Sequence, residues 1–280
     1  MIKNYKNYAN DKYDIIVLAG QSNAFGFGLG KVEDEYKPST DILLLQDEHN
    51  VDYIKTDDGL EILDVKNPTD YFIKIAEEQQ NSQGKIGCFA LYFAKKYKSE
   101  YLKNNRKIII IKAAVGGTGF IKGQWTVNGC LYNRMIDMID QLLSLNNENR
   151  IAAFLWHQGE CDVFENDGKD PQIIESDYYK NFGDFIKQIC AKYGKIPFIA
   201  GEFTEEWSKK NLQGCNAVIS ATKKVLQEYG GGRFVCSNGL KSNNQVLFNG
   251  DDIHFSRASL YELGERYYAQ FSNLINKNTI

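Results

Sequence analysis

The chain has 280 residues, 43% of them hydrophobic and 25% charged, and a formal net charge of −3 at pH 7. These values are ordinary for a globular protein that is long enough to bury a sizeable core. The charge balance gives no electrostatic case for nucleic acid or an anionic membrane as a partner.

Short apolar runs alternate with segments of helical period along the chain. This alternation predicts an α/β fold, in which helices cover both faces of a parallel sheet. Within 130–145, the residues that recur at three- and four-residue steps are Leu131, Met135, Met138 and Leu142. The predicted strands are 14–19, 42–46, 107–114, 151–156 and 196–200, with 233–236 as a further one, and the predicted helices lie near 86–103, 130–145, 175–193, 214–229 and 257–275.

Two polar and irregular stretches, 47–82 and 161–172, interrupt this alternation. No internal repeat and no low-complexity linker divides the chain. We therefore expect a single domain over residues 1–280, with its core at about 14–275 and with two elaborated loops.

No apolar run approaches the roughly 20 residues that span a bilayer, and the N-terminal segment lacks the apolar stretch of a signal peptide. We therefore expect a cytoplasmic protein by default, or a secreted one if a signal peptide was trimmed away, with no membrane partner. The six cysteines are widely spaced and form no Cys-x-x-Cys pair, so neither a zinc site nor a redox motif is predicted. Reduced thiols are expected in a cytosol, whereas the even number of cysteines permits disulfides after export.

The tetrapeptide Gly20-Gln21-Ser22-Asn23 ends the first predicted strand. Ligands of open α/β sheets bind at the carboxyl edge of the strands, which is where this serine would lie. If a helix starts at Asn23, the Ser22 amide lies at its N-terminus and can donate a hydrogen bond to a developing anion. The pattern therefore suits a nucleophile, although a serine at this position can also simply cap the helix.

Two adjacent glycines, Gly116 and Gly117, follow the strand predicted at 107–114. Because glycine has no Cβ, such residues can turn a backbone amide toward a ligand. An oxyanion-hole amide, a phosphate loop and a plain tight turn all fit these glycines. No Gly-Lys-Ser/Thr follows, so the Walker pattern is missing, and the glycines alone favour the tight turn.

The segment Trp156-His157-Gln158-Gly159-Glu160 follows the strand predicted at 151–156. Gln158 can offer a side-chain amide to an oxyanion, and Glu160 can orient or balance a nearby histidine. A capped loop with solvated carboxylates is the alternative. For His157 we expect packing in the fold or exposure at the surface.

Asp251 and His254 lie just before the last predicted helix. An aspartate three residues before a histidine can hold its Nδ1–H, so that Nε2 faces a hydroxyl. Asp252 is the competing acid. Of the three histidines, His49 lies in a polar loop without a partner motif, so His254 is the general base expected for Ser22.

Trp125 lies beyond the glycine turn. Its indole can bind substrate by stacking on a sugar ring, or it can cover an active site. Packing in the core or in an interface fits a tryptophan equally well, and both alternatives stay open.

Each of these motifs alone is a weak or moderate signal. Their joint occurrence, in this order and each at a strand end, is far more specific. On them the chain resembles the sialate O-acetylesterase-like branch of the SGNH hydrolase superfamily, which includes the carbohydrate esterase family containing acetylxylan esterases. The resemblance extends in islands from Asp14 to Tyr268. The matching blocks are Gly20-Gln21-Ser22-Asn23, Gly116-Gly117-Thr118, Trp156-His157-Gln158-Gly159-Glu160 and Asp251-x-x-His254, with Leu131-Tyr132-Asn133-Arg134-Met135 as a further match.

The resemblance implies a flavodoxin-like three-layer α/β/α sandwich with a parallel sheet of about five strands. It also implies that Ser22 is the nucleophile, that His254 is the general base and that Asp251 orients this base. Glu160 would share or replace the role of the aspartate. No metal and no organic cofactor is implied.

The oxyanion hole implied by the resemblance consists of the amides of Ser22 and Gly117, with Gly116 as the alternative, and the Gln158 side chain as third donor. The implied reaction is a two-step acyl transfer, in which an acyl-enzyme forms and is then hydrolysed. An acetylated carbohydrate is the substrate that the family implies. An α/β-hydrolase elbow would need a glycine where this chain has Ala24.

Two other functions are compatible with the same motifs. One is an O-acyltransferase that uses this site with a sugar in place of water as the acceptor. The other is a carbohydrate-binding protein with a vestigial site, against which the complete serine, aspartate and histidine set argues.

Overall fold

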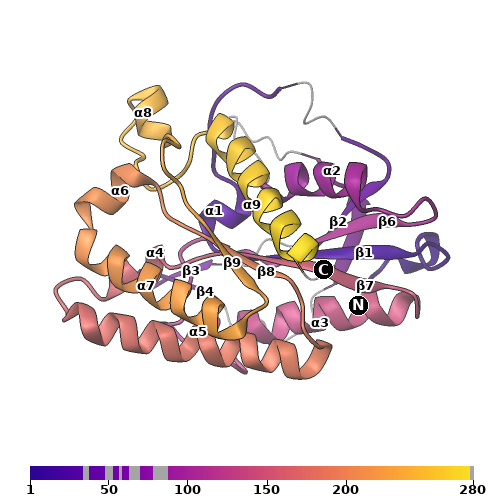
Figure 1. The fold of residues 1–280 in the computed structure, drawn as a ribbon, viewed down its shortest axis with the longest axis horizontal. Coiled ribbons are helices and arrows are strands. Elements are labelled where there is room, and N and C mark those ends of the chain that lie inside the picture. The colour runs from indigo at the N-terminus through magenta and orange to yellow at the C-terminus, as the bar shows by residue number, and fades with distance from the viewer. Residues whose placement is uncertain (34–37, 48–52, 57–58, 63–69, 78–87, 278–280) are drawn as a thin grey trace.

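The computed structural model describes residues 1–33, 38–47, 53–56, 59–62, 70–77 and 88–277. Its centre is a seven-stranded sheet with the strand order β5-β2-β6-β1-β7-β8-β9 (Figure 1). Neighbouring strands run parallel except β2 and β5, which are antiparallel. The strands are β1 (Tyr13–Gly20), β2 (Ile42–Asp47), β5 (Tyr71–Ile75), β6 (Lys107–Lys112), β7 (Arg150–His157), β8 (Phe198–Gly201) and β9 (Gly232–Val235), and a separate hairpin pairs β3 (Tyr53–Thr56) with β4 (Gly59–Ile62).

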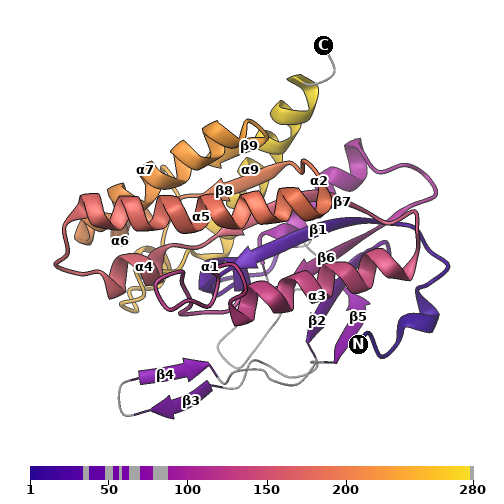
Figure 2. The ribbon, with the colours of Figure 1, turned by 90° about the horizontal axis from the view of Figure 1, so that it is seen from below.

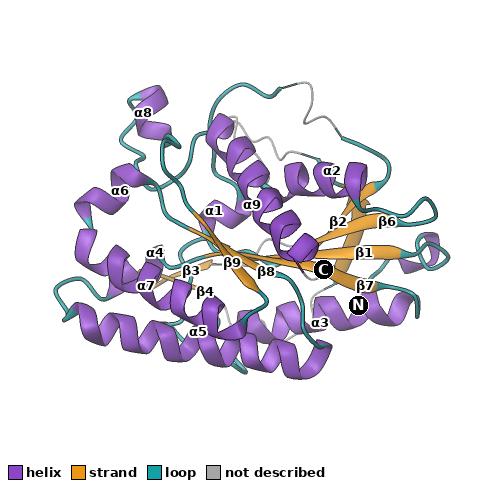
Figure 3. Cartoon of the chain, in the orientation of Figure 1, coloured by secondary structure: helices purple, strands orange, loops and turns teal. Residues whose placement is uncertain are grey.

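Helices cover both faces of the sheet and give the three layers that the alternation predicts (Figure 1, Figure 3). One face carries α2 (Ala90–Glu100) and α9 (Arg257–Lys277), and the other carries α3 (Cys130–Leu145), α5 (Pro171–Tyr193) and α7 (Leu212–Tyr229). Figure 2 shows α3 and α5 lying across the second face. Shorter helices are η1 (Tyr5–Asn7), α1 (Ser22–Phe25), α4 (Glu160–Glu165), α6 (Glu205–Lys210) and α8 (Asn243–Leu247).

The side chains of β1 explain why its sequence is apolar over residues 15–19. Ile15 and Val17 pack into the core beneath α3, α5 and α7, whereas Ile16 and Leu18 pack into the core beneath α2 and α9. A strand that is buried on both faces has no polar side to show. β1 is also central, since it pairs with β6 on one side and β7 on the other.

The sheet has seven strands rather than the expected five or so, and the extra edge strand lies within a stretch whose sequence predicts irregular structure. β5 pairs antiparallel with the edge of β2, and its Tyr71 and Ile73 are buried while Phe72 and Lys74 are only partly so. An edge strand with one buried face needs only two such apolar residues, so its apolar signature is short. In the same stretch, residues 53–56 and 59–62 form the β3–β4 hairpin. Residues 48–52, 57–58, 63–69 and 78–82 lie outside the described residues.

The prediction of an irregular stretch at 161–172 is also wrong in part. This stretch contains most of α4 and the first two residues of α5, which begins at Pro171 after an Asp170 cap that accepts a hydrogen bond from the Gln172 amide. α4 has only six residues, which is too short for an apolar period to be visible in the sequence.

None of the six cysteines, all of which lie in the described part of the chain, forms a disulfide. Among the described helices, none combines the length and the apolar character that crossing a membrane requires.

Gly20, the last residue of β1, sits at the closest approach between two central strands. Its φ is +133°, and a Cβ built on it would lie 2.0 Å from the carbonyl oxygen of His157 on β7. Only a residue without a side chain fits there. The strand end that carries the Gly20-Gln21-Ser22-Asn23 segment is thereby fixed against β7.

We expect Gly20→Ala to lower the free energy of unfolding by about 3 kcal/mol or more, since it adds a backbone clash to an unfavourable φ. Gly168→Ala is the matched control because Gly168 also has a positive φ, +76°, but no atom within 4 Å of an added Cβ. The control should cost only about 1 kcal/mol. Urea unfolding of both variants measures the difference, and equal losses would show that the contact with β7 is unimportant.

Candidate active site

The carboxyl ends of three adjacent central strands carry the predicted motifs. Ser22 follows β1, the glycine turn follows β6, and Gln158 and Glu160 follow β7. α1 and α4, which mark two of these strand ends, lie near each other in Figure 1. The strand ends therefore converge at the edge where ligands of parallel sheets bind.

Ser22 is the first residue of α1 and is 6% exposed. The preceding residue, Gln21, is held firmly because its Oε1 accepts hydrogen bonds from the Cys161 amide at 3.1 Å, the Gly159 amide at 3.4 Å and Gln158 Nε2 at 3.2 Å. The Gln21 amide donates to the His157 carbonyl at 3.0 Å. These bonds fix the turn that presents Ser22 against the end of β7.

Asn23, the residue after Ser22, ties α1 to the histidine loop. Its Nδ2 donates to Glu160 Oε1 at 2.7 Å and to the Ile253 carbonyl at 3.0 Å, and its Oδ1 accepts from the Phe255 amide at 3.1 Å. Ile253 and Phe255 are the two neighbours of His254. The neighbour of Ser22 thus binds both neighbours of His254, so the structure brings the segments of Ser22 and His254 together.

Asp251 lies against His254 as the spacing predicts. Its Oδ1 is 2.8 Å from His254 Nδ1, and the same oxygen accepts from the His254 amide at 3.3 Å. Burial alone would raise the pKa of Asp251, but hydrogen bonds from His254 and Asn243 outweigh it and hold this pKa below its usual range. The carboxylate is therefore ionised at neutral pH.

The competing acid, Asp252, does not face the histidine. Its Oδ2 accepts a hydrogen bond from Lys210 Nζ. Among the described residues, no direct hydrogen bond joins the Ser22 hydroxyl to His254. Catalytic hydrogen bonds are often long in structures without ligand and shorten when substrate binds.

Asn243 is a site residue that the sequence reasoning missed. It is fully buried, and its Nδ2 donates to Asp251 Oδ2 at 2.8 Å and to the Phe27 carbonyl at 3.0 Å. The Phe27 ring stacks on His254 with a centroid distance of 5.0 Å. The one local pattern near Asn243 is the Ser242–Gln245 capping box of α8, which predicts a helix start and not this contact.

The glycine turn after β6 lies beside the serine. A Cβ on Gly116 would come within 3.6 Å of Ser22 Cβ, whereas the space around Gly117 is open. Gly117 is exposed and has a φ of +69°. Its carbonyl accepts a hydrogen bond from Cys161 Sγ at 3.4 Å.

Gln158 lies at the same corner, but its amide has partners within the protein. Nε2 is 2.5 Å from Asp162 Oδ2, 3.1 Å from the Thr118 carbonyl and 3.2 Å from Gln21 Oε1. An amide nitrogen has only two hydrogens to donate. Both hydrogens therefore already have internal acceptors.

Glu160 is buried, and its side chain accepts a hydrogen bond from Asn23, which also bonds the histidine loop. Burial raises its pKa, although the Asn23 hydrogen bond acts in the opposite direction. Oε1 is 4.0 Å from His157 Nε2, and neither that nitrogen nor Glu160 Oε2 has a hydrogen-bond partner among the described residues. Burial therefore makes the charged form of Glu160 less favourable than it would be in water.

His157 is a packed histidine, one of the two alternatives expected. It is fully buried, its Nδ1 lies 3.0 Å from the Tyr267 hydroxyl, and burial lowers its pKa to about 3. It therefore stays neutral and has no access to substrate.

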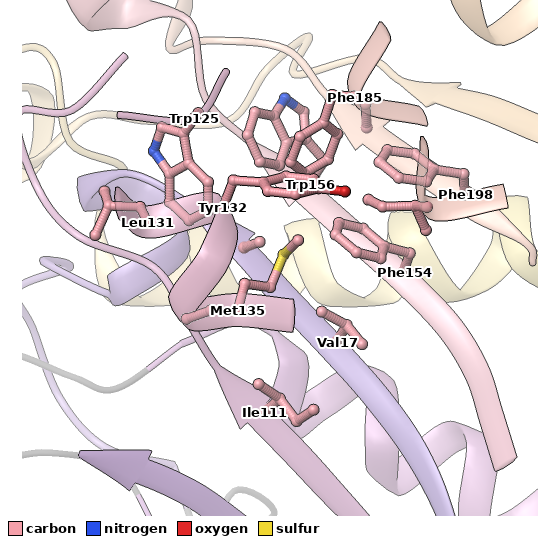
Figure 4. Close-up of a cluster of buried hydrophobic side chains, with 14 of the residues drawn as sticks. Val17, Ile111, Trp125, Leu131, Tyr132, Met135, Phe154, Trp156, Phe185 and Phe198 are labelled. Carbon is pink, nitrogen blue, oxygen red and sulfur yellow. The ribbon is translucent and has the colours of Figure 1, made fainter. Parts of the chain in front are cut away.

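Trp125 is a core residue, which corrects its placement as a substrate-binding candidate. It is fully buried, and its Nε1 donates to Thr118 Oγ1 at 2.8 Å. Its ring packs edge-on against Trp156 with a centroid distance of 5.3 Å (Figure 4). The indole is therefore not available to stack on a sugar.

Comparison with known proteins places the chain in a family. Residues 12–273 match the model of a family described as carbohydrate esterase, sialic acid-specific acetylesterase. A curated relative from Escherichia coli (strain K12), named probable 9-O-acetyl-N-acetylneuraminic acid deacetylase, is 25% identical over 234 residues, which are 71% of this chain and 69% of that protein.

Solved structures share the fold. NanS matches with a TM-score of 0.68 at 18% identity, over 95% of this chain and 98% of NanS. A carbohydrate acetylesterase from Xanthomonas citri matches with a TM-score of 0.61 at 15% identity, over 95% of this chain and 57% of that chain. Because the family model spans nearly the whole sequence, the chain belongs to the carbohydrate esterase family of sialic acid-specific acetylesterases.

Proposed function

We propose that this carbohydrate O-acetylesterase is a serine esterase, with Ser22 as nucleophile, His254 as general base and Asp251 as the acid that orients the base. The family match supports the reaction and the substrate class. The observation that carries the mechanism is the set of Asn23 hydrogen bonds, which hold the serine turn against both neighbours of His254.

In the first step, His254 Nε2 takes the proton of Ser22 as Oγ attacks the acetyl carbonyl. The 2.8 Å contact with Asp251 holds Nδ1–H, so that the neutral ring presents Nε2 as the acceptor. The tetrahedral intermediate then collapses, and His254 returns the proton to the departing sugar hydroxyl. Water, activated by the same histidine, hydrolyses the acetyl-enzyme and releases acetate.

The negative charge of the intermediate would be held by the amides of Ser22 and Gly117. Gly116 packs beside Ser22, and Gly117 lies in open space on the same turn. The Gln158 amide can join them as third donor only by giving up one of its internal acceptors. We therefore assign the oxyanion mainly to the two backbone amides.

Electrostatics distinguish the two carboxyl groups near the base. Asp251 keeps its charge because His254 and Asn243 hold its pKa low, whereas burial raises the pKa of Glu160. A carboxylate that stabilises an imidazolium must be ionised. Asp251 is accordingly the orienting acid, and Glu160 supports the site as the acceptor of Asn23.

The first substrate to test is an O-acetylated sialic acid, since the curated relative is named a 9-O-acetyl-N-acetylneuraminic acid deacetylase. Acetylated xylan and an acetylated amino sugar should be assayed beside it. Acetate release identifies the preferred sugar.

Ser22→Ala should lower kcat on such an ester by at least about 10,000-fold, because no nucleophile remains. Its melting temperature should stay close to that of the wild type. Ser220→Ala is the control, since Ser220 lies on α7 and bonds only to Glu175 in the described structure, and it should keep full activity. Wild-type turnover by Ser22→Ala would overturn the proposed function.

Asp251→Asn should lower kcat by about 1,000-fold or more, whereas Glu160→Gln should cost far less. Both changes remove a charge at nearly constant shape, and the side-chain amide introduced by Glu160→Gln would keep an oxygen for Asn23. Steady-state kinetics of the two purified variants decide between the acids. A larger loss in Glu160→Gln would assign the orienting role to Glu160.

Activity should fall as the pH is lowered from about 8 to about 5, because protonated imidazole cannot accept the serine proton. The low pKa of Asp251 keeps this carboxylate charged throughout the range, so its protonation does not produce the fall. Initial rates in buffers of constant ionic strength measure the profile. A rate that is flat over this range is incompatible with a histidine base.

A further inference from the structure

Asp162 is a buried carboxylate that the proposed mechanism does not use. It lies in the first turn of α4, two residues after Glu160, and is 3% exposed. Its carboxylate is aimed away from α4 toward the loop that follows the glycine turn. Oδ1 accepts from the Ile121 amide at 2.8 Å, and Oδ2 accepts from the Phe120 amide at 3.2 Å and from Gln158 Nε2 at 2.5 Å.

The residues that follow the glycine turn are connected to this carboxylate in two ways. Gln158 Nε2 also bonds the Thr118 carbonyl, one residue past Gly117. A Cβ on Gly119 would lie 2.6 Å from Asp162 Oδ2, so the chain passes against the carboxylate without room for a side chain. Gly117 is therefore followed by a segment whose position depends on Asp162.

We propose that Asp162 is a positioning residue for the oxyanion hole: its carboxylate clamps Phe120, Ile121 and Gln158, and so places the Gly117 amide beside Ser22. This inference rests on the proposed function. It gives the Gln158 side chain a structural partner in place of a direct contact with the oxyanion.

The clamp needs an ionised carboxylate, since all three partners are donors. Burial raises the pKa of Asp162 to about 6, against the lowering effect of its donors. The groups that face it are Glu160 and Cys161 on its own helix, Lys122 from the loop after β6 and Tyr178 from α5. Lys122 is 2.9 Å from Glu165 and forms its ion pair there.

The sign of the pH effect follows from this raised pKa. Above about pH 6 the carboxylate is charged and the clamp is closed. Below that pH a bound proton turns one carboxyl oxygen into a donor that faces an N–H group, so at least one of the three hydrogen bonds is lost and the clamp is weakened. The acid side of the kcat profile should therefore include a second protonation besides that of the general base.

The decisive variant is Asp162→Asn, which keeps the shape but turns an amide N–H toward the clamped donors. Its kcat should fall about 100-fold, as expected when an oxyanion donor is displaced by a small distance, while KM stays within about twofold. The acid side of its kcat profile against pH should also reflect the protonation of a single group, the general base. Glu165→Gln, one turn further along α4, is the control and should behave as wild type.

Each outcome is informative. Wild-type kcat in Asp162→Asn would overturn the clamp while leaving the esterase proposal intact, which Ser22→Ala tests separately. A parallel rise in KM would indicate a general loss of the site and also count against the clamp. If Asp162→Asn does not fold, the dependence of the wild-type kcat on pH decides. An acid side that reflects only one protonation would refute the inference.

Discussion

The amide of Asn23 is the interaction on which the geometry of the active site depends. It joins the helix that begins with Ser22 to the loop that carries His254, although Asn23 and Ile253 are 230 residues apart in sequence. The side chain is fully buried, so its loss would leave the Ile253 carbonyl, the Phe255 amide and Glu160 without this partner. Each unsatisfied buried polar group costs about 1–3 kcal/mol. These buried hydrogen bonds therefore stabilise the relative position of Ser22 and His254, without any direct hydrogen bond between the two side chains.

Neutral amides supply most of this scaffold. Gln21, Asn23, Gln158 and Asn243 are all buried at the site, and each bonds two or more other groups. A carboxamide donates and accepts at once and brings no charge out of water, so it can link loops at a lower desolvation cost than an ion pair. Charge is kept where the chemistry needs it: Asp251 is only partly buried and stays ionised, whereas burial shifts Glu160 toward its neutral form.

Local pattern was sufficient to predict the central strands, the long helices and the strand ends on which the candidate site lies, because residues 15–19 of β1 and 108–111 of β6 are apolar and α3 has a clear apolar face. The contact of Asp251 with His254 was predictable because they lie three positions apart in one loop. β5 was missed since an edge strand buries only alternate residues. The roles of Asn243 and Asp162 and the burial of Trp125 arise from contacts between distant segments, and no local spacing encodes such contacts.

The tetrapeptide at the end of β1 can now be explained residue by residue. Gly20 allows the close approach to β7, Gln21 binds the α4 turn, and Asn23 binds the histidine loop. Two sets of hydrogen bonds thus start from the same strand end: those of Asn23 hold the serine turn to the histidine loop, and those of Gln21 connect it through Gln158 to Asp162. Ser22 lies between them, and its hydroxyl has no hydrogen-bond partner among the described residues. In the proposed mechanism the neighbours of Ser22 make the structural contacts and leave its oxygen for the reaction, so that the serine would be both rigidly placed and reactive.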